Sequence, residues 1–411
     1  MYVGKYCELP AELALVCKLS SPSHFGTNGL DSYTLCETDS IDWKIFLEFC
    51  TIHRLYPLVY TNAREKYSTI IPKAVMAELK QLYIVNSFQM DILSGELVRI
   101  IHACSEDGIG VLAYKGPALA QVLYGDISLR VSKDLDVLIH PTDFPKVHSL
   151  MISWGYSVTT PYENANLHSI IDSDSQHHIE YIHPLKMARV EIHWRLFEAY
   201  EKPYVFDAFQ NYTNNHATIF LQGFPIPIFS PTLQFITLCF HGSKHMWNRM
   251  RWLVDISMIL HNPATLDWSQ ILQIAKESDL LPILGQTTIL LAKIFNFSPP
   301  QELRPLMDIP KAIRLAQMVL RKYSIISNPE ADHYFSLSVR LDRKYRTLIY
   351  ETRKSKSKQF KLFLVRLIRP SKSDFEMIRL PRIMFPLYFI LRPILIIIRM
   401  VRKVKISSQK G

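Results

Sequence analysis

The sequence contains no closely spaced pair of cysteines. The chain of 411 residues contains six cysteines, and none of them belongs to a Cys-x-x-Cys pair. This spacing argues against a zinc ribbon or a dithiol redox motif and favours reduced, mostly buried thiols. A His-Glu-x-x-His motif is also lacking, so zinc binding by the histidines is conceivable but has no support from their spacing. No internal repeat is visible.

A secretory signal is lacking as well. The short apolar run near the N-terminus is interrupted by Glu8, Pro10 and Glu12, whereas a signal peptide carries a continuous apolar segment. We therefore expect a cytoplasmic protein.

The most membrane-like stretch, residues 383–398, is too short to cross a bilayer. A spanning helix needs roughly 20 apolar residues, and this stretch contains Pro386, Arg392 and Pro393. Basic residues accompany it as far as Lys405. The composition allows two interpretations, a peripheral anchor on an anionic membrane or a final helix packed on the protein.

Acidic residues are fewer than basic ones, 37 against 47, and the formal net charge is +10. A positive field attracts triphosphates, nucleic acids and anionic membranes without distinguishing among them. The basic residues follow no recognition-helix pattern and are not interleaved with aromatic residues. We therefore do not expect a nucleic acid as the partner.

The spacing of apolar residues predicts an α+β fold in four parts. Helical spacing begins at Asp42, gives way to short apolar runs after Gly108, and returns from Pro231 onward. The parts are a helical N-terminal region, a core of strands and helices, a helical domain, and a basic linker with an apolar and basic tail, at 1–107, 108–230, 231–350 and 351–411. The linker is most basic from Arg353 to Lys361.

Short apolar runs within the core predict four strands. A Lys115-Gly116 turn follows the first run, and a helix is expected from Pro117, because proline suits the first turn of a helix. Another helix is expected from about Thr142 to Trp154. The strands are expected at Val111–Tyr114, Asp134–His140, His177–Ile182 and Arg189–Trp194.

Two of these strands carry carboxylates on one face. Residues two apart in a strand point to the same side, so Asp134 and Asp136 project together, and Glu191 projects with Arg189 and His193. Carboxylates suit magnesium, which binds through one or two of them plus substrate phosphates. Three acids on neighbouring strands can hold two metal ions. The alternative is a solvated strand end, with Glu191 paired to Arg189.

The residues before the acid pair suit an anion. Gly116 lies where a strand turns into a helix, so its backbone can approach a phosphate and the helix amides can point at it. Lys115 adds a positive charge there, and the planar fork of Arg130 matches phosphate oxygens. Either cation could equally be a solvated surface residue.

Further candidates for substrate contact are polar residues near these strands and in the helical domain. Arg189 and His193 share a face with Glu191, while His241 and His245 lie one helical turn apart. Helix packing is the alternative explanation for the two helical histidines.

The order of these motifs resembles the polymerase-beta-like nucleotidyltransferase superfamily, and within it a poorly characterised bacterial nucleotidyltransferase family. The resemblance covers roughly Asp42 to Phe295 and includes a helical stretch from His241 to Asp255. One departure is Pro117, because the superfamily usually has serine or glycine after the turn glycine. The motifs are Lys115-Gly116, Arg130, Asp134-x-Asp136 and Glu191-Ile192-His193-Trp194.

The resemblance implies a polymerase-beta-like core that transfers a nucleotidyl group from a nucleoside triphosphate. It assigns Asp134, Asp136 and Glu191 to magnesium, and the Lys115-Gly116 turn to the phosphates. The acceptor is expected to be a small molecule, a glycan precursor or a peptide. Two alternatives stay open: phosphoryl transfer on the same fold, and a scaffold without catalysis that binds nucleotide or docks on a membrane.

Overall fold

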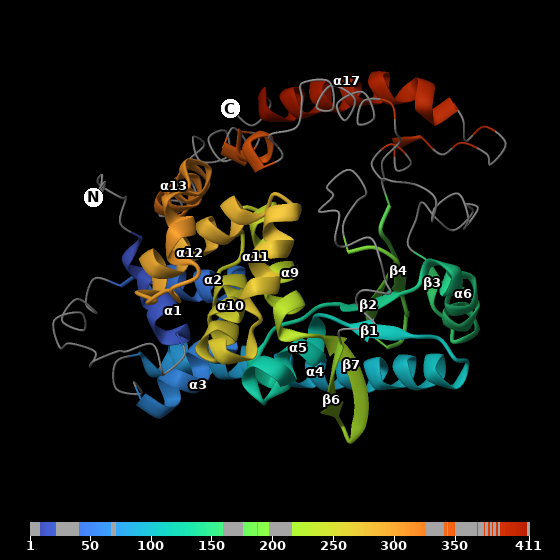
Figure 1. The fold of residues 1–411 in the computed structure, drawn as a ribbon, viewed down its shortest axis with the longest axis horizontal. Helices are drawn as coiled ribbons and strands as arrows, with labels where there is room; N and C mark the ends of the chain where they lie inside the picture. The colour runs from blue at the N-terminus through green and yellow to red at the C-terminus, as the bar shows by residue number, and fades with distance from the viewer. Residues whose placement is uncertain are drawn as a thin grey trace.

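A mixed sheet with helices packed around it forms the centre of the computed structural model (Figure 1). The structure describes residues 9–21, 41–66, 71–158, 176–186, 188–196, 216–325, 341–342, 344–349 and 387–408, with single positions between 368 and 384. The predicted basic linker from Arg353 to Lys361 lies outside the described residues.

The sheet has seven strands in the order β3-β4-β5-β2-β1-β7-β6. The β2–β5 and β1–β7 pairs are parallel and the remaining neighbouring pairs are antiparallel, so the sheet is mixed, as expected for an α+β fold. The strands are β1 (Val111–Ala113), β2 (Leu135–Ile139), β3 (Ser157–Val158), β4 (His178–Ile182), β5 (Arg189–His193), β6 (His216–Leu221) and β7 (Phe224–Phe229).

One face of the sheet is apolar and packs against two helices. Leu135, Val137 and Ile139 of β2 join a buried cluster with residues of α4 (Lys73–Glu106) and α6 (Phe144–Ser153). From Met90 to Cys104 the buried apolar residues of α4 recur every three or four positions, which gives this part of the helix one continuous face toward the sheet. Figure 1 shows α4 running along this side of the sheet.

A second buried cluster joins helices from both ends of the chain. The Cys17 Sγ atom lies 3.0 Å from the Met250 Sδ atom, so α1 packs directly against the segment before α10. The side chain of Asp42 caps the start of α2 by accepting hydrogen bonds from the backbone N–H groups of Lys44 and Ile45, as N-cap residues do. The helices of this cluster are α1 (Ala11–Ser20), α2 (Trp43–Ile52), α3 (Tyr56–Lys66), α9 (Pro231–Lys244), α10 (Arg251–His261), α11 (Trp268–Glu277), α12 (Leu281–Phe295) and α13 (Pro310–Ile325).

The remaining described elements are further helices and short 3-10 turns. Helix α17 lies on the opposite side of the molecule from α4 in Figure 1. Among the described residues, no helix combines the length and apolar character needed to cross a membrane. These elements are α5 (Gly116–Tyr124), α17 (Leu387–Ser408) and the 3-10 turns η3 (Ile127–Leu129), η4 (Pro141–Asp143), η8 (Pro263–Thr265) and η9 (Arg304–Asp308).

The predicted strands correspond to β1, β2, β4 and β5 within one residue at each end. The short strand β3 and the β6–β7 hairpin were not predicted. Pro225 and Pro227 lie in β7, and proline within an apolar run argues against a strand because it lacks a backbone donor. The hairpin extends the sheet beyond β1. The four-part division of the chain stays a prediction.

Candidate active site

The polar face of the sheet brings together two of the predicted carboxylates. Strands β2 and β5 are parallel neighbours, and Asp136 lies directly opposite Glu191 in their register. Together with His193, these side chains offer three ligand atoms that all lie within 4.8 Å of one another. Val137 and Ile192 point to the apolar face, which keeps the acids on the other side.

Asp134 lies one residue before β2 rather than inside it. Burial raises the pKa of its carboxyl group, and the charges of Asp136 and Glu191 raise it further. Asp134 is therefore close enough to interact electrostatically with both acids. Like charges that are forced together in this way are typical of sites that bind cations.

Asp136 is buried and interacts with two cationic or titratable groups. Its Oδ1 atom lies 3.2 Å from Lys115 Nζ and 3.3 Å from His193 Nε2. Burial alone would raise the pKa of this carboxyl group, but Lys115 and His193 hold it below its usual range.

His193 joins the two acids. Its Nε2 atom also lies 3.2 Å from Glu191 Oε2. Burial would lower the pKa of His193, but the hydrogen bonds to Asp136 and Glu191 outweigh it and raise the pKa. The same interaction lowers the pKa of Glu191 against the effect of its own burial. The Tyr114 hydroxyl, which the sequence reasoning did not single out, lies 3.3 Å from Asp136 Oδ1.

The Lys115-Gly116 turn faces the acid pair. Gly116 has a φ of +62°, a conformation that favours glycine, and a Cβ atom there would lie 3.5 Å from the Asp134 carbonyl oxygen. The backbone of the turn therefore approaches the backbone of the acid segment. Pro117 occupies the first turn of α5, where its missing amide costs no helical hydrogen bond.

Arg130 lies between this turn and Asp255 of α10. Its guanidinium group is buried, and both Nε and Nη2 donate to the carboxylate of Asp255 at 3.1 to 3.2 Å. Nη1 donates to the Gly116 carbonyl at 3.4 Å. The Tyr124 hydroxyl donates to the same carboxylate at 2.9 Å. Arg130 thus joins α10 to the turn.

The other predicted contact residues divide into two groups. Arg189 is exposed and pairs with Glu180, with 2.8 Å between Nη1 and Oε1, and Glu180 lies opposite Glu191 on the neighbouring strand, so this pair borders the acid cluster. His241 lies near the cluster, because its pKa, lowered mainly by burial, is also influenced by Lys115 and Asp136. The rings of His241 and His245 are 4.8 Å apart.

Three further arginines lie near Asp134 or near Asp255. The sequence reasoning missed Arg54, whereas it placed Arg249 and Arg251 on a polar helical face that could border the site. The charge of Asp134 acts on Arg54 and on Arg249. Arg251 is buried beside Arg130 and Asp255, and among the described residues its Nε and Nη1 atoms have no hydrogen-bond partner. Arg54 lies in the turn after α2, and no local sequence motif connects it with the acid pair. Arg249 and Arg251 lie just before and at the first residue of α10, within the stretch from His241 to Asp255 that the resemblance covers.

The chain belongs to the uncharacterised nucleotidyltransferase family, whose pattern matches residues 39–296, more than half of the sequence. No curated protein and no solved structure matches the chain. Family membership gives the protein a transferase role, with nucleotidyl transfer as its general reaction. The match includes every carboxylate of the cluster and the Lys115-Gly116 turn.

Proposed function

We propose that the protein transfers a nucleotidyl group from a nucleoside triphosphate to a small-molecule, glycan-precursor or peptide acceptor, with magnesium, on a polymerase-beta-like core. The observation that carries this proposal is the position of Asp136 opposite Glu191 on parallel strands, facing the Lys115-Gly116 turn. An acid pair beside a tight glycine turn is the arrangement that this chemistry needs.

The acid cluster fits magnesium by its chemistry. Asp134, Asp136 and Glu191 supply carboxylate oxygens, which magnesium prefers to nitrogen ligands. Bound by these residues, the metal would neutralise the triphosphate and activate the attacking hydroxyl. Lys115 Nζ now pairs with Asp136, and a cation on the carboxylate would replace that interaction. Lys115 would then contact the phosphates beside Gly116.

The surrounding arginines fit a triphosphate. A buried guanidinium with unpaired donors is costly unless an anion accepts from them, and Arg251 has two such donors among the described residues. Arg54 and Arg249 add positive charge near Asp134. We propose that these residues attract the triphosphate, while Arg130 supports the turn by holding the Gly116 carbonyl.

The acceptor side of the site is proposed for the histidines. His193 contacts both acids, and His241 lies close enough to Lys115 and Asp136 to interact with their charges. The His245 ring, one helical turn after His241, lies tilted against the rings of His241 and Trp252, with centroids 4.8 Å and 5.7 Å away. Arg189, which is paired with Glu180 at the exposed end of β5, is assigned only to the outer edge of this surface.

Product analysis tests the proposed function. The full chain is incubated with each nucleoside triphosphate, magnesium and a set of hydroxyl acceptors, and pyrophosphate release and the mass of the acceptor are measured. We expect pyrophosphate together with an acceptor heavier by one nucleoside monophosphate. Release of a nucleoside diphosphate would instead show phosphoryl transfer, and triphosphate binding without any product would show a non-catalytic scaffold.

A further inference from the structure

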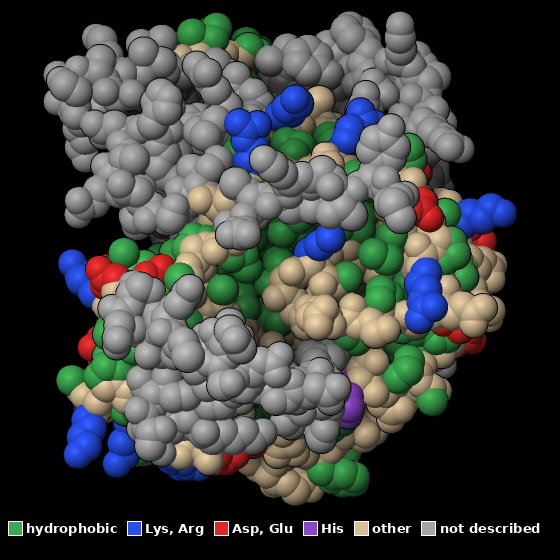
Figure 2. All heavy atoms as spheres, turned by 90° about the vertical axis from the view of Figure 1, so that its left-hand side faces the viewer, with side chains coloured by type: hydrophobic (Ala, Val, Ile, Leu, Met, Phe, Trp, Pro, Cys, Tyr) green, Lys and Arg blue, Asp and Glu red, His purple; other side chains and the backbone are tan. Residues whose placement is uncertain are grey.

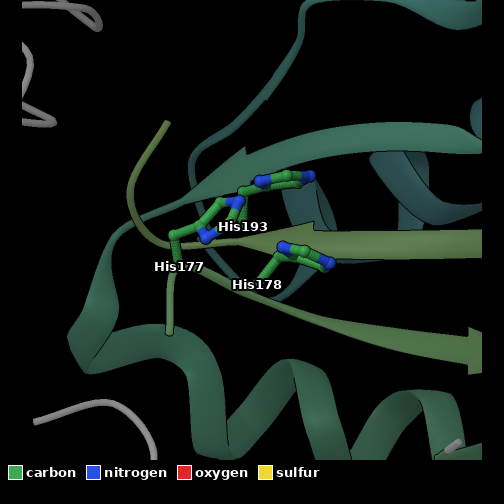
Figure 3. A group of neighbouring side chains, drawn as sticks. All are labelled: His177, His178 and His193. Atoms are coloured by element: carbon green, nitrogen blue, oxygen red, sulfur yellow. The ribbon is translucent and has the colours of Figure 1, made fainter. Parts of the chain in front are cut away.

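A group of three histidines lies beside the acid cluster. His193 is the last residue of β5, His178 lies opposite it at the start of β4, and His177 immediately precedes β4. Antiparallel pairing places His178 and His193 on one face, and the bend at His177 brings a third imidazole to the same end of the strands. Figure 3 shows the three side chains gathered at this end.

The three rings are close enough to share one ligand. Their centroids lie 4.4 Å apart for His177 and His178, 4.7 Å for His178 and His193, and 5.6 Å for His177 and His193. One nitrogen from each ring can be chosen so that all three lie within 4.8 Å of one another. His178 Nδ1 is buried and has no hydrogen-bond partner among the described residues.

We propose that His177, His178 and His193 bind one divalent transition-metal ion of the zinc type. Imidazole nitrogens suit zinc, cobalt, nickel and copper, whereas magnesium and calcium prefer oxygen. Three histidines with a fourth position left to water or substrate are a recurrent zinc arrangement. This site adjoins the proposed magnesium site through His193, but its ligands are imidazoles and not carboxylates, and it does not depend on the proposed transferase reaction.

Asp136 and Glu191 contact one of the three histidines, His193. His193 Nε2 lies 3.2 Å from Glu191 Oε2 and 3.3 Å from Asp136 Oδ1. Histidines that bind metals usually present their other ring nitrogen to a carboxylate, which fixes the ring and increases its basicity. Asp136 and Glu191 have this relation to His193, so a metal ion bound by the histidines would also act electrostatically on the acid pair.

Metal titration of the full chain tests the site. Zinc binding is measured by calorimetry, and cobalt is used as a spectroscopic probe because a protein site of this kind gives visible absorption. We expect one zinc per chain, undisturbed by millimolar magnesium. His177→Asn and His178→Asn should each weaken zinc binding by at least about tenfold, the lower end of the effect of outer-shell changes alone. The matched control is His102→Asn on α4, where the side chain is half-exposed.

Melting curves give a second measurement of zinc binding and also show whether each variant is folded. Zinc should raise the melting temperature of the wild type and of His102→Asn, because a ligand that binds only the folded state stabilises it, and the shift should vanish in both cluster variants. His177 lies outside the paired strand residues, so His177→Asn decides the question if His178→Asn fails to fold. Absent zinc binding, equal binding in His177→Asn and wild type, or displacement of zinc by equimolar magnesium would overturn the proposal.

Discussion

Two buried charged clusters lie a few residues apart in this protein and differ in their balance of charge. Arg130 and Asp255 pair through three hydrogen bonds, with the Tyr124 hydroxyl as a further donor. In the second cluster, Asp136 contacts Lys115 and His193, and Glu191 contacts His193. The Arg130–Asp255 pair is satisfied within the protein, whereas the carboxylates of Asp134, Asp136 and Glu191 repel one another. Satisfied charges hold a fold together, and an unbalanced group indicates a ligand.

The largest expected effect concerns the balanced cluster. Asp255→Asn should lower the free energy of unfolding by about 3–5 kcal/mol, because it leaves the buried Arg130 charge without its partner. Chemical denaturation measures this loss, and Asp91→Asn on the exposed face of α4 serves as the control. A variant with normal stability but no turnover would contradict the comparison, since Asp255 would then serve function and not structure.

The next effect concerns the acid cluster. Asp136→Asn should reduce metal-dependent turnover by at least about a hundredfold, since changes to groups behind metal ligands already cost about 10–100-fold. Asp134→Asn should act in the same direction. Asp134→Asn should not approach the instability of Asp255→Asn, because it relieves repulsion between carboxylates. Asp136→Asn should cost more stability than Asp134→Asn, because it removes the shared partner of Lys115 and His193. Unchanged turnover in both variants, with normal magnesium dependence, would remove these acids from the mechanism.

The difference between the clusters also explains what could be predicted from sequence. The face shared by Asp136 and Glu191 follows from the two-residue period of a strand, which is local information. The partner of Arg130 was missed because Asp255 is 125 residues away in sequence, and only packing of α10 against the turn brings it there. Arg130 was expected at the phosphates, and the structure shows its buried guanidinium donating to Asp255 and to the Gly116 carbonyl.

Other elements were missed for different physical reasons. The β6–β7 hairpin contains two prolines that resemble a break in the pattern, yet the strand is formed and pairs with β1 through Ala113 and Ile228. The histidine group could be predicted only from the register of β4 against β5, because His193 is 15 to 16 positions from His177 and His178 in sequence. Neither the charge balance nor the register of a sheet is visible in a local window.

A third charged group, centred on Glu96, allows the comparison to be tested by changing the pH. Glu96 on α4 is buried and accepts from Arg99 Nε at 3.1 Å, Lys186 Nζ at 3.2 Å and the Tyr156 hydroxyl. Burial would raise the pKa of Glu96, but the hydrogen bonds from Arg99 and Tyr156 outweigh it and lower the pKa from its ordinary 4.5. By charge balance, this group belongs with Arg130 and Asp255.

The sign of the pH effect follows from that lowered pKa. The unfolded chain binds the proton more readily, so the stabilisation is complete above pH 4.5 and disappears as pH falls below it. Glu96→Gln should cost about 1.5–3 kcal/mol at pH 7, and the cost should shrink toward pH 3. Denaturation at both pH values measures it. An equal cost at both would show that the contact depends on shape and not on charge.

The smallest expected effect concerns helix α17, where the same contrast separates the two interpretations of the tail. Arg392, which lies within the membrane-like stretch, donates to the buried carboxylate of Asp374 and so forms an ion pair inside the protein. The isoleucines behave differently. Ile390, Ile394 and Ile397 are 69%, 52% and 60% exposed, and their spacing places them on one side of the helix.

An exposed apolar stripe beside a positively charged end suits the surface of an anionic membrane. We therefore expect peripheral association, and replacing the three isoleucines with serine should reduce binding to anionic vesicles by roughly tenfold or more, since burying one such side chain is worth about 1.5–3 kcal/mol. The melting temperature should stay nearly constant, because the replaced groups already face solvent. Flotation with anionic and neutral vesicles, beside a melting curve, measures both quantities. No flotation of the wild type, together with a lower melting temperature in the variant, would show that this face packs on the protein itself.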